Sequence, residues 1–82
     1  MKRYILYSEI AKGFLASTKR DKNDNIIREQ VEVTESIDEA LKYDTIGEGM
    51  KTSSDIYAST LINGERVFGS GWYLFKVFPI ER

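Results

Sequence analysis

The pattern of hydrophobic and polar positions predicts β-strands in four segments of the chain. The four predicted strands are Arg3–Glu9, Phe14–Thr18, Ile26–Val33 and Trp72–Phe78. The first strand has apolar side chains on both faces, with Tyr4 and Leu6 on one face and Ile5 and Tyr7 on the other. The last strand is also apolar on both faces, so we expect neighbouring structure to cover both sides of these two strands.

Short polar segments between the strands predict how they pair. A turn at Lys12–Gly13 joins the first two strands and makes them antiparallel. The cluster Lys19–Asn25 predicts the next turn, because Asp and Asn side chains hydrogen-bond to nearby backbone groups. The apolar face of the third strand consists of Ile27, Val31 and Val33. Pro79 is expected to end the pairing of the last strand, because proline has no N–H to donate.

The period changes to that of a helix after the third strand. Ser36 and Glu39 have the spacing of a capping box, in which each side chain accepts a hydrogen bond from the backbone of the other. The apolar positions that follow at helical spacing are Ile37, Ala40 and Leu41. They predict a short helix over Ile37–Tyr43. Thr45 and Glu48 repeat the signature more weakly, because two nearby glycines each disfavour a helix interior by roughly 1 kcal/mol.

The segment Met50–Gly64 has two interpretations. As a helix, it would end at Asn63–Gly64 and present one face made of Met50, Ser53, Ser54, Tyr57 and Leu61. As two strands, Ile56–Ile62 alternates and Asn63–Gly64 forms a hairpin turn. The helix is favoured, because two further strands would leave little to cover the sheet. The sequence therefore predicts a single α+β domain (1–82): a small antiparallel sheet of three to five strands with one or two helices on one face.

Composition excludes several kinds of chemistry. The chain of 82 residues contains neither Cys nor His, so it has no thiol nucleophile, no Ser-His-Asp triad and no thiolate or imidazole metal site. The chain has 12 Lys and Arg and 13 Asp and Glu, which give a net charge of −1. This charge argues against extensive electrostatic binding to the nucleic-acid backbone. Apolar runs are too short to span a bilayer, and Glu9 comes too early for a signal peptide. We predict a non-enzymatic, cytoplasmic protein without cofactor or metal.

Two patterns imitate ligand-binding loops. Asp21–Asn25, followed by Glu29 and Glu32, has the spacing of calcium ligands, but Ile26 stands where such a loop needs glycine. A solvated hairpin turn is the simpler interpretation. Gly64–Gly71 has the glycines of a phosphate-binding loop but lacks its lysine, and it leads into a strand rather than a helix. Neither pattern predicts a metal or phosphate site.

The two terminal strands carry more apolar side chains than so small a fold is expected to hide. One or two helices cover one face of a small sheet, which would leave Ile5, Tyr7 or their counterparts exposed on the other. Exposed apolar surface above a few hundred Å² usually marks an interface. We therefore expect a homo-oligomer, or a protein whose fold is completed by its target.

Four segments carry a resemblance to a known group of proteins. They are Tyr4–Leu6, Gly13–Leu15, Ala40–Thr45 and Trp72–Val77. With them the chain resembles small accessory proteins encoded by phages and prophages of Gram-positive bacteria. Members of that group with assigned roles inhibit host enzymes or antagonise host immunity, either by occluding a defence protein or by sequestering its cyclic-nucleotide signal.

The resemblance implies a phage protein that antagonises a bacterial defence system by binding, in the cytoplasm of the host cell. Sequestering a nucleotide-derived signal would require aromatic rings for stacking and cations for the phosphates. The candidate ligand-binding residues are Arg66, Phe68, Trp72, Tyr7 and Lys12. The alternative is a protein–protein interaction module that occludes a host or defence protein without a small ligand.

Overall fold

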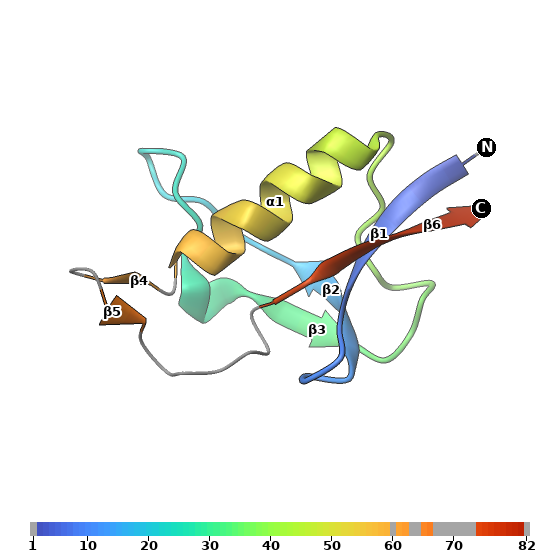
Figure 1. Cartoon of the computed structure of the whole chain (residues 1–82), viewed down its shortest axis with the longest axis horizontal. Helices are drawn as coiled ribbons and strands as arrows, with labels where there is room; N and C mark the ends of the chain where they lie inside the picture. Colours follow the sequence, from blue (N-terminus) through green and yellow to red (C-terminus); the bar gives the residue numbers. More distant parts are fainter. Residues whose placement is uncertain (1, 60, 63–64, 67–73, 82) are drawn as a thin grey trace.

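The computed structural model describes residues 2–59, 61–62, 65–66 and 74–81. Within them lie a four-stranded antiparallel sheet in the order β3-β2-β1-β6, one α-helix and a separate two-stranded hairpin (Figure 1). The sheet consists of β1 (Lys2–Ser8), β2 (Gly13–Ser17), β3 (Glu32–Thr34) and β6 (Lys76–Glu81). The other elements are the 3₁₀-helix η1 (Arg28–Gln30), the helix α1 (Ile46–Ser59) and the hairpin strands β4 (Leu61–Ile62) and β5 (Glu65–Arg66). The predicted small α+β fold is confirmed.

The first strand, β1, organises the sheet. It pairs with β2 through a tight turn on one side and with β6 along its length on the other. Lys2 lies opposite Glu81, so the first and last strands run side by side, as Figure 1 shows. The antiparallel pairing predicted for the first two strands is confirmed.

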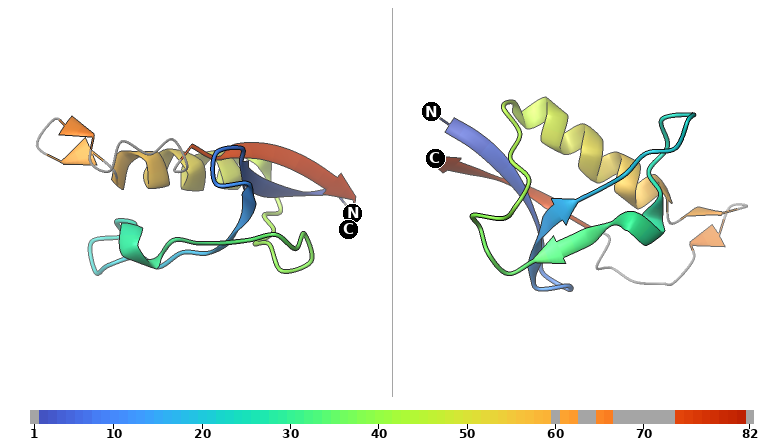
Figure 2. Two further views of the ribbon diagram at one scale, coloured as in Figure 1. Left: turned by 90° about the horizontal axis from the view of Figure 1, so that it is seen from below. Right: turned by 180° about the vertical axis from the view of Figure 1, so that it is seen from behind.

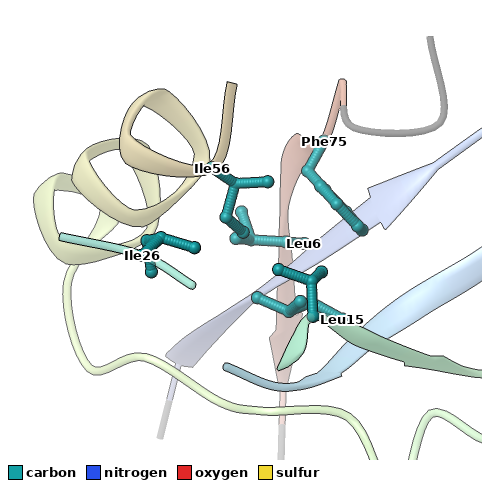
Figure 3. Close-up of a cluster of buried hydrophobic side chains, with 6 residues drawn as sticks. Leu6, Leu15, Ile26, Ile56 and Phe75 are labelled. Atoms are coloured by element: carbon teal, nitrogen blue, oxygen red, sulfur yellow. The ribbon is translucent and has the colours of Figure 1, made fainter. Parts of the chain in front are cut away.

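The core lies between α1 and the sheet. Its six buried side chains are Leu6, Leu15, Ile26, Val31, Ile56 and Phe75. Figure 3 shows five of them converging from α1, from β1 and β2, and from the loops before β3 and β6. Seen edge-on, α1 occupies one layer and the segment from the polar turn through β3 the other (Figure 2). The helix thus covers one face of the small sheet.

Pro79 lies inside β6, so the expectation that it ends the pairing is wrong. It stands opposite Tyr4, whose N–H and C=O both hydrogen-bond to Tyr43 across 2.8 Å on the far side of β1. A residue opposite Tyr4 therefore needs no N–H toward β1. Because β6 is an edge strand, the proline nitrogen faces the open edge of the sheet, where proline is tolerated.

The helix predicted over Ile37–Tyr43 is wrong, because residues 37–40 form turns. Tertiary hydrogen bonds outcompete the local helical signal. The Leu41 N–H donates to the Leu15 carbonyl on β2 at 2.9 Å, and Tyr43 forms an isolated antiparallel bridge with Tyr4 on β1. These bonds hold the segment extended against the sheet, where a helix could not form them.

The two residues of the predicted capping box use other partners. The Glu39 carboxylate accepts a hydrogen bond from the Thr34 hydroxyl at 3.0 Å, and the Ser36 N–H donates to the same hydroxyl oxygen at 3.1 Å. Lys42 then satisfies the carbonyls of the turn with its ammonium group. Its Nζ donates at 2.9–3.1 Å to the carbonyl oxygens of Ile37, Asp38 and Ala40.

The helix α1 begins at the weaker of the two capping signals in the sequence, that of Thr45 and Glu48. The Thr45 hydroxyl accepts a hydrogen bond from the Glu48 N–H at 3.2 Å, which caps the first turn. Gly49 faces the sheet, and a Cβ there would lie 3.3 Å from Val77 on β6 and 3.7 Å from Leu6 on β1. The glycine that weakens the helix in isolation therefore lets it approach the sheet closely.

Both interpretations of Met50–Gly64 are partly right. The helix continues to Ser59, and β4 and β5 then pair as a hairpin. The predicted turn, Asn63–Gly64, lies outside the described residues. The third strand is shorter than predicted, because η1 replaces its first half, and Val33 is 40% exposed rather than buried. The last strand begins later than predicted, at Lys76.

Candidate functional site

Three aromatic rings gather on the sheet face that points away from α1. The strand register places Tyr7 opposite Phe14 on β2, and Phe78 opposite Ile5 on β6. The Tyr7 ring lies between the other two, with centroid separations of 5.0 Å to Phe14 and 6.2 Å to Phe78. Both pairs are tilted or edge-on, which are favourable arrangements for aromatic rings.

A groove of about 450 Å³ runs over these rings. The residues that line it are Ile5, Tyr7, Phe14, Ile37, Phe78 and Ile80. We call these six residues the aromatic face. Phe78 is 41% exposed, and Tyr7 is half-buried. Exposure on this face was expected for Ile5, Tyr7 or their counterparts: Phe78 is exposed, whereas Ile5 is only 2% exposed and has Ile37 beside it in the groove lining.

Exposed ion pairs flank the aromatic face on the same strands. Arg3 on β1 lies 3.7 Å from the Asp44 carboxylate, and Lys76 on β6 lies 3.5 Å from Glu9. Exposed pairs of this kind add little to stability. They do give the apolar groove a border with charges of both signs.

A second, polar cavity of about 250 Å³ lies between the polar turn and the last turns of α1. Arg20 donates to the Asp55 carboxylate at 2.9 Å and to the Asp24 carbonyl at 2.8 Å. Lys51 donates to the same Asp55 oxygen at 2.9 Å. These contacts hold the turn against the helix, so we interpret the cluster as a structural link between the two.

The Asp55 link predicts a pH dependence of stability. The hydrogen bond from Lys51, together with that from Arg20, lowers the pKa of the Asp55 carboxyl below its ordinary value of 3.8. A lowered pKa stabilises the folded state above the unfolded pKa, and this contribution disappears as the pH falls through the folded pKa. We expect Asp55→Asn to be less stable than the wild-type protein near neutral pH, and the difference to shrink below about pH 4.

Urea denaturation of both proteins between pH 7 and pH 2 measures this difference. Asp24→Asn is the control, because its carboxylate is 3.8 Å from Arg20 and 77% exposed, so its effect should be small at every pH. An Asp55→Asn difference that stays constant as the pH falls would contradict the assignment.

The calcium-like segment is a self-contained turn. Asp21 accepts hydrogen bonds from the N–H groups of Asn23 and Asn25 at 2.9 and 3.0 Å. Asp24 adopts a positive φ of 65°, which an Asp tolerates in a turn. The carboxylate that a metal would need is thus occupied by the backbone. In the part of the chain that the structure describes, no group of three or more acidic side chains is placed to hold a metal ion.

Two described side chains titrate away from their ordinary values. Burial raises the pKa of the Tyr43 phenol above its ordinary value. The hydrogen bond with Thr52 lowers this pKa by a smaller amount. The pKa of Asp55 is lowered by its cationic partners. Each shift moves the group further from neutral pH, whereas a general acid or base works best with a pKa near the working pH.

Three of the five candidate ligand-binding residues lie among the described residues. Tyr7 lies on the aromatic face, and Lys12 is exposed in the turn that follows β1, with a φ of 56°. Arg66 belongs to β5, at the end of the molecule away from that turn in both orientations (Figures 1 and 2). Phe68 and Trp72 lie outside the described residues. The backbone of β5 thus lies away from the turn that contains Lys12, and a joint site of these five residues stays a prediction.

The sequence interpretation missed the two rings that flank Tyr7. From the sequence, Phe14 and Phe78 are only the end residues of the predicted strands Phe14–Thr18 and Trp72–Phe78. The position of Phe14 could be predicted from the turn at Lys12, because a tight turn between Ser8 and Gly13 places residues 7 and 14 opposite each other. The position of Phe78 could not be found in this way, because the register of β6 on β1 is set by no local turn.

In the described part of the chain, no helix is both long and apolar enough to cross a membrane. No protein-family model, no curated protein sequence and no solved structure matches this chain.

Proposed function

We propose that this protein is a non-catalytic binding module whose aromatic face docks on a partner protein and occludes it. The observation that carries the proposal is the groove of about 450 Å³, whose lining is almost entirely apolar and includes three aromatic rings, with Tyr7 packed against both Phe14 and Phe78. Interface hot spots are enriched in aromatic side chains within dry pockets. A border of paired charges, as at Arg3 and Lys76, favours a protein surface over a lipid or a small molecule.

The same geometry favours occlusion of a protein over sequestration of a nucleotide. Phosphate groups need cationic partners, and the lining of the aromatic face contains none. Arg3 and Lys76 beside it each face a carboxylate. The likeness to phage accessory proteins makes a bacterial host or defence protein the partner class to test first.

Site-specific photo-crosslinking in a Gram-positive host tests this proposal. A benzophenone amino acid at position 78 should capture one protein, and the same group at Ile10, which is 64% exposed in the turn after β1, should not. The captured protein is then purified and titrated with the wild-type protein, Phe78→Ser and Phe78→Leu. We expect at least roughly tenfold weaker binding by Phe78→Ser and near wild-type binding by Phe78→Leu.

Three results would overturn the proposal. The first is equal capture at positions 78 and 10, and the second is unchanged binding by a folded Phe78→Ser. The third is a rise of several degrees in the midpoint of thermal unfolding when a cyclic nucleotide is added. A ligand at 100 times its Kd increases the free energy of unfolding by about 2.7 kcal/mol, which produces a shift of that size. That rise would favour signal sequestration.

A further inference from the structure

A second exposed apolar surface lies along α1 and shares no residue with the aromatic face. Along α1, Ile46, Met50 and Tyr57 recur at helical spacing and are 52%, 58% and 39% exposed. Leu74, just before β6, continues this stripe and is 50% exposed. A groove of about 510 Å³ runs between the helix and the segment 74–77. We call these four residues the helix stripe.

We propose that two copies of this chain pair through the helix stripe, with their α1 helices antiparallel about a two-fold axis. The middle of the stripe consists of the small residues Ser53 and Ser54, and both line the groove. Small side chains there allow two helices to approach closely. An axis between Ser53 and Ser54 places Met50 of each copy opposite Tyr57 of the other, which is a favourable sulfur–aromatic contact.

The charge distribution suits a second copy. Lys51 and Asp55 bond to each other on a different side of the helix, where Asp55 also binds Arg20. Of the described residues that line the groove, only Lys76 is charged. The net charge of −1 gives two copies little reason to repel each other. Antiparallel helices also place opposite ends of their dipoles together.

The area is that of a small dimer interface. Four half-exposed large side chains contribute roughly 350 Å² of apolar surface per copy. The two serines, the stem of Lys76 and the edges of the groove add to this area. The smallest specific complexes bury about 600 Å² per partner, so we expect a weak dimer that forms at micromolar concentration.

The open edge of β6 offers a different route to pairing, and Pro79 disfavours it. The edge-facing backbone groups of β6 alternate along the strand, and at Pro79 the outward position has no N–H to donate. A second sheet added at this edge would therefore lack a hydrogen bond in the middle of the strand. The helix stripe has no such obstacle.

Sedimentation velocity from about 5 µM to about 500 µM tests the dimer. We expect the wild-type protein and Ile10→Asp to shift from monomer to dimer across this range, and Met50→Asp to remain a monomer throughout. Ile10 and Met50 are both exposed apolar residues, but only Met50 lies on the stripe. A wild-type monomer at the highest concentration, or a folded Met50→Asp that still dimerises, would overturn the proposal.

Engineered cysteines test the register, because the chain has no cysteine of its own. Two residues can form a disulfide when their Cα atoms lie within about 7 Å. Ser54→Cys lies beside the proposed axis and should crosslink to its own copy under mild oxidation. Ala58→Cys, exposed one turn further along α1, would be separated from its counterpart by roughly 13 Å along the helices and should not. Equal crosslinking of both variants would overturn the arrangement.

This dimer is independent of the proposed function. The helix stripe and the aromatic face share no residue. Loss of dimerisation in Met50→Asp with partner binding intact would separate the two, and so would loss of partner binding in Phe78→Ser with dimerisation intact.

Discussion

Replacing Leu6 with alanine is expected to remove most of the stability of this protein. Leu6 is fully buried at the centre of the core, where β1 meets α1. Deleting a buried leucine side chain to alanine costs about 3–5 kcal/mol, through lost burial and the cavity that remains. A domain of this size has a free energy of unfolding of roughly 4–12 kcal/mol, so much of the population is expected to unfold at moderate temperature.

Urea denaturation at low protein concentration measures this loss, with Leu74→Ala as the matched control. The control deletes the same atoms from a side chain that is 50% exposed, so it should cost less than about 1 kcal/mol. A Leu6→Ala protein as stable as Leu74→Ala would show that the packing of β1 against α1 is not the centre of the core.

The two glycines at the start of α1 are expected to respond in opposite directions. At Gly49 even a Cβ would lie 3.3 Å from Val77, so a leucine there must push α1 away from β6. Overpacking of this kind costs about 1–3 kcal/mol. At Gly47 a Cβ meets only the Thr45 hydroxyl at 4.0 Å. Gly47→Ala should therefore gain up to about 1 kcal/mol from better helix propensity.

The midpoints of urea unfolding distinguish the two variants. We expect the Gly49→Leu midpoint to fall and the Gly47→Ala midpoint to rise, with the dependence on denaturant unchanged in both. Stabilisation by Gly49→Leu would mean that the close approach of helix and sheet has no role in the fold.

Local patterns predicted the elements that short-range signals define. Two-residue alternation and a tight turn were enough for the pairing of β1 and β2, and the Thr45 cap marked the start of α1. The stronger capping signal at Ser36 failed, because its segment exchanges backbone bonds with Tyr4 and Leu15, which are distant in the sequence. Local helix propensity is worth tenths of a kcal/mol per residue and yields to such tertiary contacts.

The candidate site was harder to predict than the fold. Tyr7 was identified from the apolar excess of its strand, and Phe14 could have been placed from the turn. The third ring comes from Phe78, whose position depends on the pairing of β6 with β1 across the whole length of the chain. Pro79 was misinterpreted for the same reason. Whether a proline interrupts a strand depends on which edge its nitrogen faces, and no local pattern contains that information.

The pairing of β1 with β6 also constrains how the protein is made. During synthesis β1 leaves the ribosome well before β6, so the central strand waits with one edge open until β6 has emerged. Such non-local contacts slow folding and expose the nascent chain to aggregation in the meantime. A premature stop before Lys76 would leave Leu6 without its neighbour Val77, so the sheet cannot be completed until β6 has been translated.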